Sequence, residues 1–419
     1  MNRFVGIVGT ADTKLEELVW LKHCLRRAEV DSMIIDVSTL MLMDEQNKII
    51  DISSLKVAEY SSGGVATVFC GDRGKAIASM SSALTNFLNK SINDIDGIIG
   101  IGGSGGTALI THAMQSLPIG LPKIMISTMA SGNVSGYIGT SDIAMIYAVT
   151  DLCGLNRVSR SILSNAASMM AGAVKHTAPL IYIDKPALGL TMFGVTTPCI
   201  NQITSNLNTQ YDCLPFHATG HGGASMEKLV SDGELVAALD ITLTEIADLL
   251  FDGVLSCPDT RLDVIAKKRI PWIGSTGALD MVNFGSKETI PERYKNRTFV
   301  EHNAQVTLMR TTPEENYQLG VWIGNKLNKC HGPIRFIIPE GGFSALDCPE
   351  QPFYLPAATL AFTDGLEKTV NQTEHRKIIK TPFHINSPEF CSLVVQHFEE
   401  IIQHQGIFNE ALSSNNKRD

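Results

Sequence analysis

The sequence predicts an α/β protein built from two Rossmann-like, doubly wound domains with mainly parallel sheets, facing each other across a cleft. Short apolar runs alternate with helical patterns along the 419 residues. The runs are continuous rather than alternating, which is typical of parallel strands covered on both faces. The alternation pauses near residue 185 and then starts again. We therefore expect an N-terminal domain (1–185), a C-terminal domain (186–410) and a disordered tail (411–419).

The first half of the chain carries five apolar runs with the length of strands. We expect strands at 3–8, 32–37, 96–101, 123–128 and 143–149. The 3.6-residue period predicts helices at 14–28, 75–90, 107–116 and 159–176. Residues 177–189, "TAPLIYIDKPALG", carry two prolines and are expected to form a linker.

The same alternation returns in the second half. We expect strands at 188–196, 212–220, 235–241, 270–275, 298–302, 334–339 and 377–385. Helices are expected at 198–209 and 224–232, between the later strands, and at the end, over about 387–404. The last helix is expected to cross back over the second sheet or to close it.

Composition excludes several classes of protein. The chain is 44% hydrophobic and 18% charged, with a formal net charge of −9. Its Lys and Arg residues are scattered, which argues against a nucleic-acid partner. No run approaches the ~20 apolar residues of a membrane span, and the first apolar run is too short for a signal peptide. Nine cysteines without a CxxC pair suit the reducing cytoplasm and argue against a zinc cluster.

Glycine-rich turns follow several predicted strands, at the edge where open α/β sheets bind ligands. They are "GTADTK" (9–14), "GIGGSGGT" (100–107), "TMASGNVSGYIGTSD" (128–142), "HATGHGG" (217–223), "GSTGALD" (274–280) and "EGGFSALD" (340–347). Between residues 97 and 141 the only charged residue is Lys123. A buried central sheet explains part of this. The turns also offer backbone N–H groups and helix N-termini, which are the components of an anion site.

"GIGGSG" (100–105) matches G-x-G-x-x-G, but the acid expected about 20 residues later in a dinucleotide site is absent. An NAD site is therefore disfavoured, and the chain has no Walker A motif. The turn "GTADTK" allows two interpretations. Thr13 and Glu16 fit a capping box. Alternatively, Lys14 neutralises a phosphate, Asp12 holds Mg²⁺ or a ribose hydroxyl, and Asp142 reaches the same rim.

Polar residues also collect in the second half. His217 and His302 are the candidate general acids or bases, because histidine titrates near neutrality. Asp280 joins them as a candidate catalytic residue, and Arg310 suits a carboxylate or phosphate of a substrate. A single histidine at a strand end is often a satisfied core residue. A metal site from His217, His302 and an acid is an alternative without support from spacing. "TPEEN" (312–316) is an ordinary helix start.

Eight blocks of sequence, in this order, resemble a known family. They are "GTADTKLEEL", "GIGGSGGTALIT", "STMASGNVSGYIGTSDI", "LGLTMFGVTTPCI", "FHATGHGG", "GALDMVNFG", "HNAQVTLMRTTPEEN" and "GGFSALD". They are similar to the ATP-binding domain of the tomato mosaic virus resistance protein and its bacterial relatives, a family long left uncharacterised. The resemblance covers about residues 3–395. It implies two Rossmann-like subdomains, a homodimer, and ATP with Mg²⁺ in the first subdomain. Longer members carry a TIM barrel, so the barrel expected for this chain is a separately encoded protein.

The resemblance also implies which residues bind ATP. The candidates are Thr10, Asp12, Thr13, Lys14, Gly102, Gly103, Ser104, Gly105, Gly106, Thr107, Ser131, Gly132, Gly139, Thr140, Ser141 and Asp142. The chain departs from the family pattern at His221 and at Glu301, both in the second domain. These departures therefore affect the expectation of a shared reaction in the second domain more than the expectation of ATP binding in the first.

We therefore expect an ATP-dependent enzyme, a ligase or phosphotransferase, that acts on a small carboxylated or phosphorylated metabolite. Two alternatives stay open. The first is a nucleotide-responsive binding protein without turnover. The second is a hydrolase or lyase in the C-terminal domain with regulatory ATP.

Overall fold

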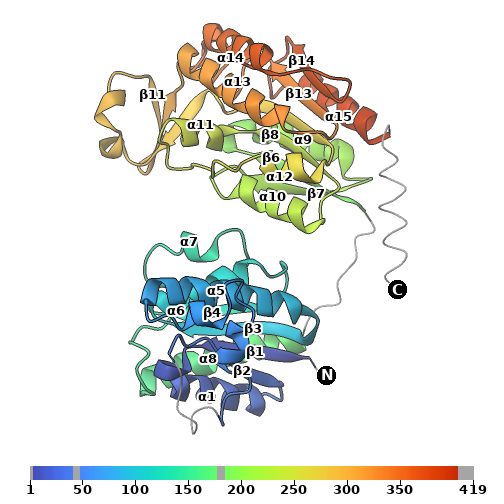
Figure 1. The fold of residues 1–419 in the computed structure, drawn as a ribbon. Helices are drawn as coiled ribbons and strands as arrows, with labels where there is room; N and C mark the ends of the chain where they lie inside the picture. The colour runs from blue at the N-terminus through green and yellow to red at the C-terminus, as the bar shows by residue number, and fades with distance from the viewer. Residues whose placement is uncertain (1–2, 41–47, 177–184, 404–419) are drawn as a thin grey trace. The chain divides into compact units, whose positions relative to one another are not determined.

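The computed structural model describes residues 3–40, 48–176 and 185–403. The chain divides into two compact units, 1–181 and 182–419, and each is described by itself (Figure 1). Most of the expected linker, residues 177–184, lies outside the described residues, and so does the expected tail at 411–419.

Unit 1 contains a parallel sheet in the strand order β2-β1-β3-β4-β5. Its strands are β1 (Phe4–Gly9), β2 (Ser32–Asp36), β3 (Ile95–Gly102), β4 (Lys123–Ser127) and β5 (Ala144–Tyr147). The order is that of flavodoxin-like folds, in which successive connections leave β1 toward one edge and β3 toward the other. The topological switch point therefore lies between β1 and β3.

Helices cover both faces of this sheet (Figure 1). One face carries α1 (Ala11–Arg27) and α8 (Arg157–Lys175), and the other carries α5 (Arg73–Lys90) and α6 (Ser104–Gln115). Leu18, Leu21 and Leu25 recur at helical spacing on α1 and pack with Val5 and Ile7 of β1. Short helices complete the unit: α3 (Ser54–Ala58), α4 (Val65–Val68), α7 (Ser135–Ile138) and the 3₁₀ turn η1 (Ile92–Asp94).

Unit 2 repeats this order with one more strand, as β14-β13-β9-β8-β6-β7. The strands of this parallel sheet are β6 (Ala187–Met192), β7 (Asp212–His217), β8 (Ala237–Thr242), β9 (Trp272–Gly277), β13 (Ile334–Pro339) and β14 (Arg376–Thr381). Both units are thus doubly wound α/β folds, as the sequence predicts.

Helices α9 (Thr197–Leu207) and α15 (Pro388–Gln403) cover one face of the second sheet. The Cys391 thiol of α15 donates to the Cys199 carbonyl of α9, and Phe398 packs edge-on against Tyr211 in the turn that follows α9. The other face carries α10 (Gly222–Asp232), α11 (Thr244–Leu250), α12 (Asp263–Lys268), α13 (Pro313–Asn328) and α14 (Pro356–Thr369). Of the two alternatives expected for the last helix, the first is observed: α15 follows the edge strand β14 and crosses back over the second sheet, where it contacts β13, β9 and α9.

One part of the second domain differs from the prediction. The strand expected at 298–302 is β11, which is labelled in Figure 1. It belongs to a separate antiparallel sheet with the strand order β10-β12-β11. Its strands are β10 (Met281–Phe284), β11 (Phe299–Asn303) and β12 (Val306–Arg310). The expected α-helix between 275 and 298 is wrong, because this stretch forms β10 and the 3₁₀ turns η3 (Lys287–Thr289) and η4 (Glu292–Tyr294). Asn303 accepts a hydrogen bond from the Gln305 amide and so turns β11 back into β12.

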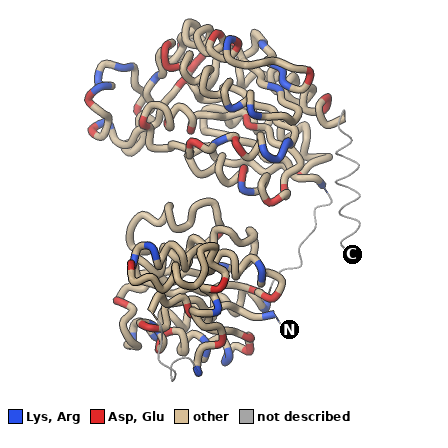
Figure 2. Tube along the Cα trace, viewed as in Figure 1, with Lys and Arg blue, Asp and Glu red and all other residues tan. Residues whose placement is uncertain are grey.

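Basic and acidic residues are intermixed along the described part of both units (Figure 2). Among the described helices, none has the length and hydrophobicity needed to cross a bilayer. All nine cysteines lie in the described residues and are free thiols.

Candidate functional site

A cavity of about 520 Å³ lies at the switch point of unit 1. The turns after β1 and β3, the segment after β2 and the start of α5 line it together. Its volume falls in the range of small-molecule sites, roughly 300–1,000 Å³. The lining residues are Thr10, Asp12, Thr13, Lys14, Val37, Thr39, Leu40, Gly71, Asp72, Arg73, Ala76, Ile77, Gly103, Ser104, Gly105, Gly106 and Leu109. The structure thus brings two of the three N-terminal motifs together.

Helix α1 begins three residues earlier than predicted, at Ala11, and its cap comes from the neighbouring strand. The Asp36 carboxylate accepts the Ala11 amide at 2.9 Å, and the Ser38 hydroxyl accepts the Asp12 amide at 3.0 Å. The predicted capping box of Thr13 and Glu16 is wrong, since Thr13 already lies inside the helix. The first amides of α1 therefore have protein partners.

Asp12 and Asp36 bring two carboxylates to the base of this turn. Asp36 is fully buried, and Asp12 is partly buried at the cavity wall. Within the described residues, Asp12 Oδ1 and Asp36 Oδ2 accept no hydrogen bond. Burial, followed by the negative charge of Asp36, raises the pKa of Asp12 above its ordinary value. A bound cation would compensate the negative charge of these two carboxylates and would pair with their free oxygens.

Lys14 lines the cavity, but its ammonium already has a partner. Nζ donates to the Leu152 carbonyl at 2.7 Å, in the segment that follows β5. The Lys14 backbone also leaves helical geometry, with φ −136° and ψ 24°. The structure therefore does not direct this ammonium to the cavity in the way that the predicted phosphate contact requires.

The turn after β3 enters α6 directly, because the helix starts at Ser104 instead of residue 107. Its N-cap, Gly103, contributes no side-chain cap, so the amides of Ser104, Gly105 and Gly106 have no partner in the described part of the chain. These amides and the positive end of the helix dipole, on the cavity wall, are the components from which anion sites are built.

Two other candidates in this motif have structural roles. A Cβ on Gly102 would lie 2.6 Å from the Thr107 amide nitrogen, so glycine is needed for the strand to meet the helix closely. Thr107 is fully buried, and its hydroxyl lies 2.6 Å from the Ser127 hydroxyl. Gly102 and Thr107 therefore shape the turn from behind the cavity wall.

The third N-terminal motif does not reach the cavity lining. Its candidates were Ser131, Gly132, Gly139, Thr140, Ser141 and Asp142. The Asp142 carboxylate pairs with Lys123 at 2.6 Å and accepts the Gly120 amide at 2.8 Å, at the amino end of β4. The expectation that Asp142 lies on the same rim is thus wrong, because the segment returns to the opposite edge of the sheet before β5 begins.

Two segments of the cavity lining were not predicted from the sequence: the stretch after β2, with Val37, Thr39 and Leu40, and the start of α5. Gly71, Asp72 and Arg73 come from "GDRGKA" (71–76), which lies outside the glycine-rich turns named from the sequence. Asp72 caps α5 by accepting the Lys75 amide at 3.1 Å. The pattern in the sequence that could have indicated this segment is an aspartate at a helix N-cap, Asp72, followed directly by an arginine, Arg73.

The candidate acid–base residues of unit 2 do not form one site. His217 ends β7 and contacts Phe193 with tilted rings whose centroids lie 5.3 Å apart, whereas His302 lies on β11 of the antiparallel sheet. Both side chains are exposed. The described residues contain no group of three or more His, Cys, Asp or Glu arranged to hold a metal ion.

Asp280 and Arg310 are brought together, but inside the protein. Arg310 donates to the carbonyls of Phe353, Asp280 and Thr311, and its Nη2 lies 3.3 Å from Asp347. Burial and the nearby Asp347 raise the pKa of Asp280 to about 7, while Arg310 and a hydrogen bond from Ser344 oppose the shift. The predicted substrate contact of Arg310 is not supported, because its guanidinium holds buried loops together.

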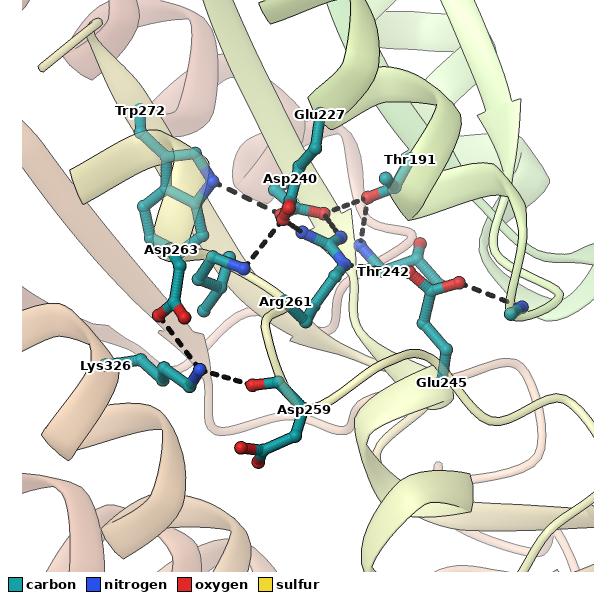
Figure 3. Close-up of polar contacts among 12 residues, drawn as sticks. Thr191, Glu227, Asp240, Thr242, Glu245, Asp259, Arg261, Asp263, Trp272 and Lys326 are labelled. Atoms are coloured by element: carbon teal, nitrogen blue, oxygen red, sulfur yellow. Dashed lines mark hydrogen bonds and ion pairs between the residues drawn. The ribbon is translucent and has the colours of Figure 1, made fainter. Parts of the chain in front are cut away.

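A second buried network surrounds Arg261 (Figure 3). Its guanidinium lies 2.6 Å from Glu227, 2.8 Å from Asp240 and 2.8 Å from Glu245. Thr191 and Trp272 also donate to Asp240. The three carboxylates come from α10, β8 and α11, so this network ties helices to the centre of the sheet.

The network also explains the "HATGHGG" motif. A Cβ on Gly223 would lie 1.8 Å from Glu245 Oε1, and one on Gly222 would lie 1.8 Å from the His217 carbonyl oxygen. Gly220 has φ +85°, and its amide donates to Glu245 at 3.0 Å. Gly223 therefore allows close packing around Glu245 and Arg261, Gly222 allows close approach to the His217 backbone, and the Gly220 amide is paired with Glu245.

Comparison with known proteins gives the chain its family. Models for the N-terminal and C-terminal domains of an uncharacterised protein family, UPF0261, match residues 3–179 and 185–402. A UPF0261 protein of Rhizobium meliloti (strain 1021) is 50% identical over 398 residues, covering 95% of this chain and 98% of the relative. One from Clostridium tetani (strain Massachusetts / E88) is 41% identical, covering 93% and 97%.

The ToMV resistance protein Tm-1(GCR237) of Solanum lycopersicum is 43% identical over 423 residues, covering 95% of this chain and 55% of the tomato protein. A solved UDP-N-acetylglucosamine 2-epimerase from Rickettsia bellii is similar only at a TM-score of 0.24 and 11% identity, which supports no argument about the site. The matches to both domain models, and the relatives aligned over nearly the whole chain, show that this protein belongs to the UPF0261 family.

Proposed function

We propose that unit 1 binds ATP as its magnesium complex and that the chain is an ATP-dependent enzyme acting on a small carboxylated or phosphorylated metabolite. The observation that carries the proposal is the cavity at the β1/β3 switch point, where an uncapped helix N-terminus and a partly buried carboxylate line the same space. That the nucleotide is ATP is what the resemblance drawn from the sequence motifs implies.

The residues present fit such a ligand. The amides of Ser104, Gly105 and Gly106 would bind phosphate oxygens. Asp12, with Asp36 behind it, would hold Mg²⁺, which proteins usually bind through one or two carboxylates together with substrate phosphates. The apolar lining residues Val37, Leu40, Ala76, Ile77 and Leu109 offer a surface for the nucleoside. Bound Mg²⁺ would supply charge neutralisation at the phosphates.

The direct test is calorimetric titration with ATP in the presence of Mg²⁺ and then of EDTA. We expect Asp12→Asn to weaken Mg-ATP binding by about 10-fold or more and to reduce the effect of EDTA, because the cation loses a charged ligand. The matched control is Asp31→Asn, an exposed aspartate at the amino end of β2, away from the cavity. Equal affinities in the two variants would contradict the assignment of Asp12.

Incubation with Mg-ATP and candidate metabolites tests the reaction. Release of ADP or AMP that depends on the metabolite supports a phosphotransferase or ligase. Tight binding without product favours the alternative of a nucleotide-responsive binding protein. Turnover of a metabolite that is abolished by His217→Ala, with ATP affinity unchanged, favours a hydrolase or lyase in unit 2.

Two further proposals come from the resemblance, and a third, the cytoplasmic location, comes from the cysteine pattern. We propose that the protein is a homodimer, that it acts in the cytoplasm, and that a separately encoded TIM-barrel protein is its partner. Sedimentation of the purified chain, alone and mixed with a barrel protein encoded beside it, tests the first and third of these.

A further inference from the structure

Two cationic side chains line the cavity of unit 1, Lys14 and Arg73. Lys14 belongs to the family motif, and the sequence predicts that it neutralises a phosphate. In the structure the Lys14 ammonium donates to the Leu152 carbonyl at 2.7 Å. Releasing it toward a ligand would break this bond and leave a partly buried carbonyl unpaired, which has a free-energy cost.

Arg73 has no such commitment. It is exposed, and no hydrogen bond or ion pair of its guanidinium is found among the described residues. The adjacent acid, Asp72, is engaged elsewhere: it accepts the Lys75 amide at 3.1 Å and lies 3.6 Å from the Lys75 ammonium. The Arg73 guanidinium thus keeps its five donors for a ligand.

The position of Arg73 on α5 brings it next to the anion site. Arg73 is the first residue of the helix, and Ile77 follows one turn later on the same face. The Ile77 Cδ1 atom lies 3.3 Å from the place where a Cβ on Gly105 would be. The face that carries Arg73 is therefore turned toward the first turn of α6, where the amides of Ser104, Gly105 and Gly106 begin the helix.

We propose that Arg73, and not Lys14, is the cation that binds the terminal phosphates of the nucleotide, together with the first-turn amides of α6. A planar guanidinium binds phosphate oxygens in pairs, which gives both charge and geometry. The site then selects ligands by the number of phosphates, and favours a nucleoside triphosphate over a monophosphate. This inference rests on the proposed nucleotide site.

Calorimetric titration of the full chain with Mg-ATP, ADP and AMP tests the assignment. Arg73→Met keeps the aliphatic part of the side chain and removes the charge. We expect it to weaken ATP binding by about 10- to 100-fold, the usual range for a lost charge-assisted hydrogen bond, and to change AMP binding by less than about 3-fold. Arg73→Lys is expected to recover part of the loss, because it restores charge without the planar fork.

The chain provides a matched control in Lys75→Met. Lys75 lies in the same turn of α5 and is exposed, but it does not line the cavity. Lys75→Met and Lys14→Met are both expected to retain ATP affinity within about 3-fold. The thermal midpoint of each variant shows that it is folded, and all substituted positions except Lys14 are exposed.

The outcomes separate this inference from the one on which it rests. If the wild type binds none of the three nucleotides, the proposed function fails. If the wild type binds ATP, but Arg73→Met matches Lys75→Met, the assignment of Arg73 is overturned. If Lys14→Met instead loses the preference for ATP over AMP, Lys14 is the phosphate ligand and the inference is also overturned.

Discussion

The Arg261 Nη2 atom lies 2.8 Å from Asp240 Oδ1, and neither side chain has any exposed surface. Glu227 and Glu245 complete the surroundings of the same guanidinium. Three buried carboxylates surround this one cation. The guanidinium therefore supplies the positive charge that compensates their burial. Two predictions follow from this relationship.

Arg261→Met is expected to lower the free energy of unfolding by about 3–5 kcal/mol, because it leaves buried carboxylates without their counter-charge. Urea denaturation measures the change. Arg293→Met is the control, since Arg293 pairs with Asp252 on the surface and its side chain is 58% exposed. The control should change stability by less than about 1 kcal/mol. Similar losses in the two variants would argue against a structural role for the buried network.

Gly223→Ala tests the close approach of "HATGHGG" to this network. The added methyl group would overlap Glu245 and Arg261, so we expect a loss of about 1–3 kcal/mol, typical of an overpacked core. Gly194→Ala is the matched control, since a Cβ there meets no atom within 4 Å. Thermal unfolding of both variants should separate them, and a stable Gly223→Ala protein would contradict the packing described.

The buried carboxyl of Asp280 predicts a dependence of stability on pH. Its pKa of about 7 in the folded protein lies above the unfolded value of about 3.9. Between these values the folded state keeps a proton that the unfolded state releases, so the free energy of unfolding falls as the pH rises. Burial also raises the pKa of Asp248 to about 7, so it contributes in the same direction.

Asp280→Asn should therefore flatten the stability curve from about pH 4 to pH 7, since an amide keeps the hydrogen bond from Ser344 without titrating. Urea midpoints at several pH values for the variant and the wild type measure this. Asp364→Asn, in an exposed pair with Lys368, serves as the control. A variant curve with the wild-type slope would show that Asp280 is not the titrating group.

Lys14→Met should loosen the segment that follows β5. Its ammonium binds the Leu152 carbonyl, and the nearby Gly154 amide donates to Glu17. Without the first contact, we expect faster hydrogen exchange at residues 152–154 and little change in α8. Exchange monitored by mass spectrometry measures both regions. Unchanged exchange at 152–154 would mean that other contacts hold the segment.

The sequence predicted the parallel sheets well because their strands are continuous apolar runs between helices. It failed at β10 and β12, where an antiparallel sheet interrupts the alternation. The pairing of Met281 with Arg310 joins residues far apart in the chain, and no local pattern encodes that contact.

Helix starts show the same limit. Residues 312–315, "TPEE", form the capping box that their spacing suggests, with Thr312 accepting the Glu315 amide. Residues 13–16, "TKLE", have the same spacing but no capping box, because Asp36 and Ser38 cap that helix from another strand. The local sequence shows which residues could cap a helix. Contacts with other parts of the fold determine whether those residues form the cap.

Only part of the cavity lining in unit 1 could be predicted, again because tertiary contacts determine the rest. The turns after β1 and β3 meet because the strand order places them at the switch point, which the α/β pattern implies. Asp142 was misplaced, since the sequence does not show that residues 128–142 return to the amino edge before β5 begins. Arg73 was missed because only turns that directly follow a strand were considered. Helix α5 follows the short helices α3 and α4 instead of a strand.

The packing of α15 on α9 has a consequence for how the protein is made. The first helix of unit 2 receives its cover from the last described helix of the chain, so the core around Cys199 and Cys391 stays open until residue 403 has been synthesised. The described elements of unit 1 end at Lys175 and need no later segment for their own core. Unit 1 can therefore complete its core on the ribosome while the apolar face of α9 still lacks the cover that α15 provides.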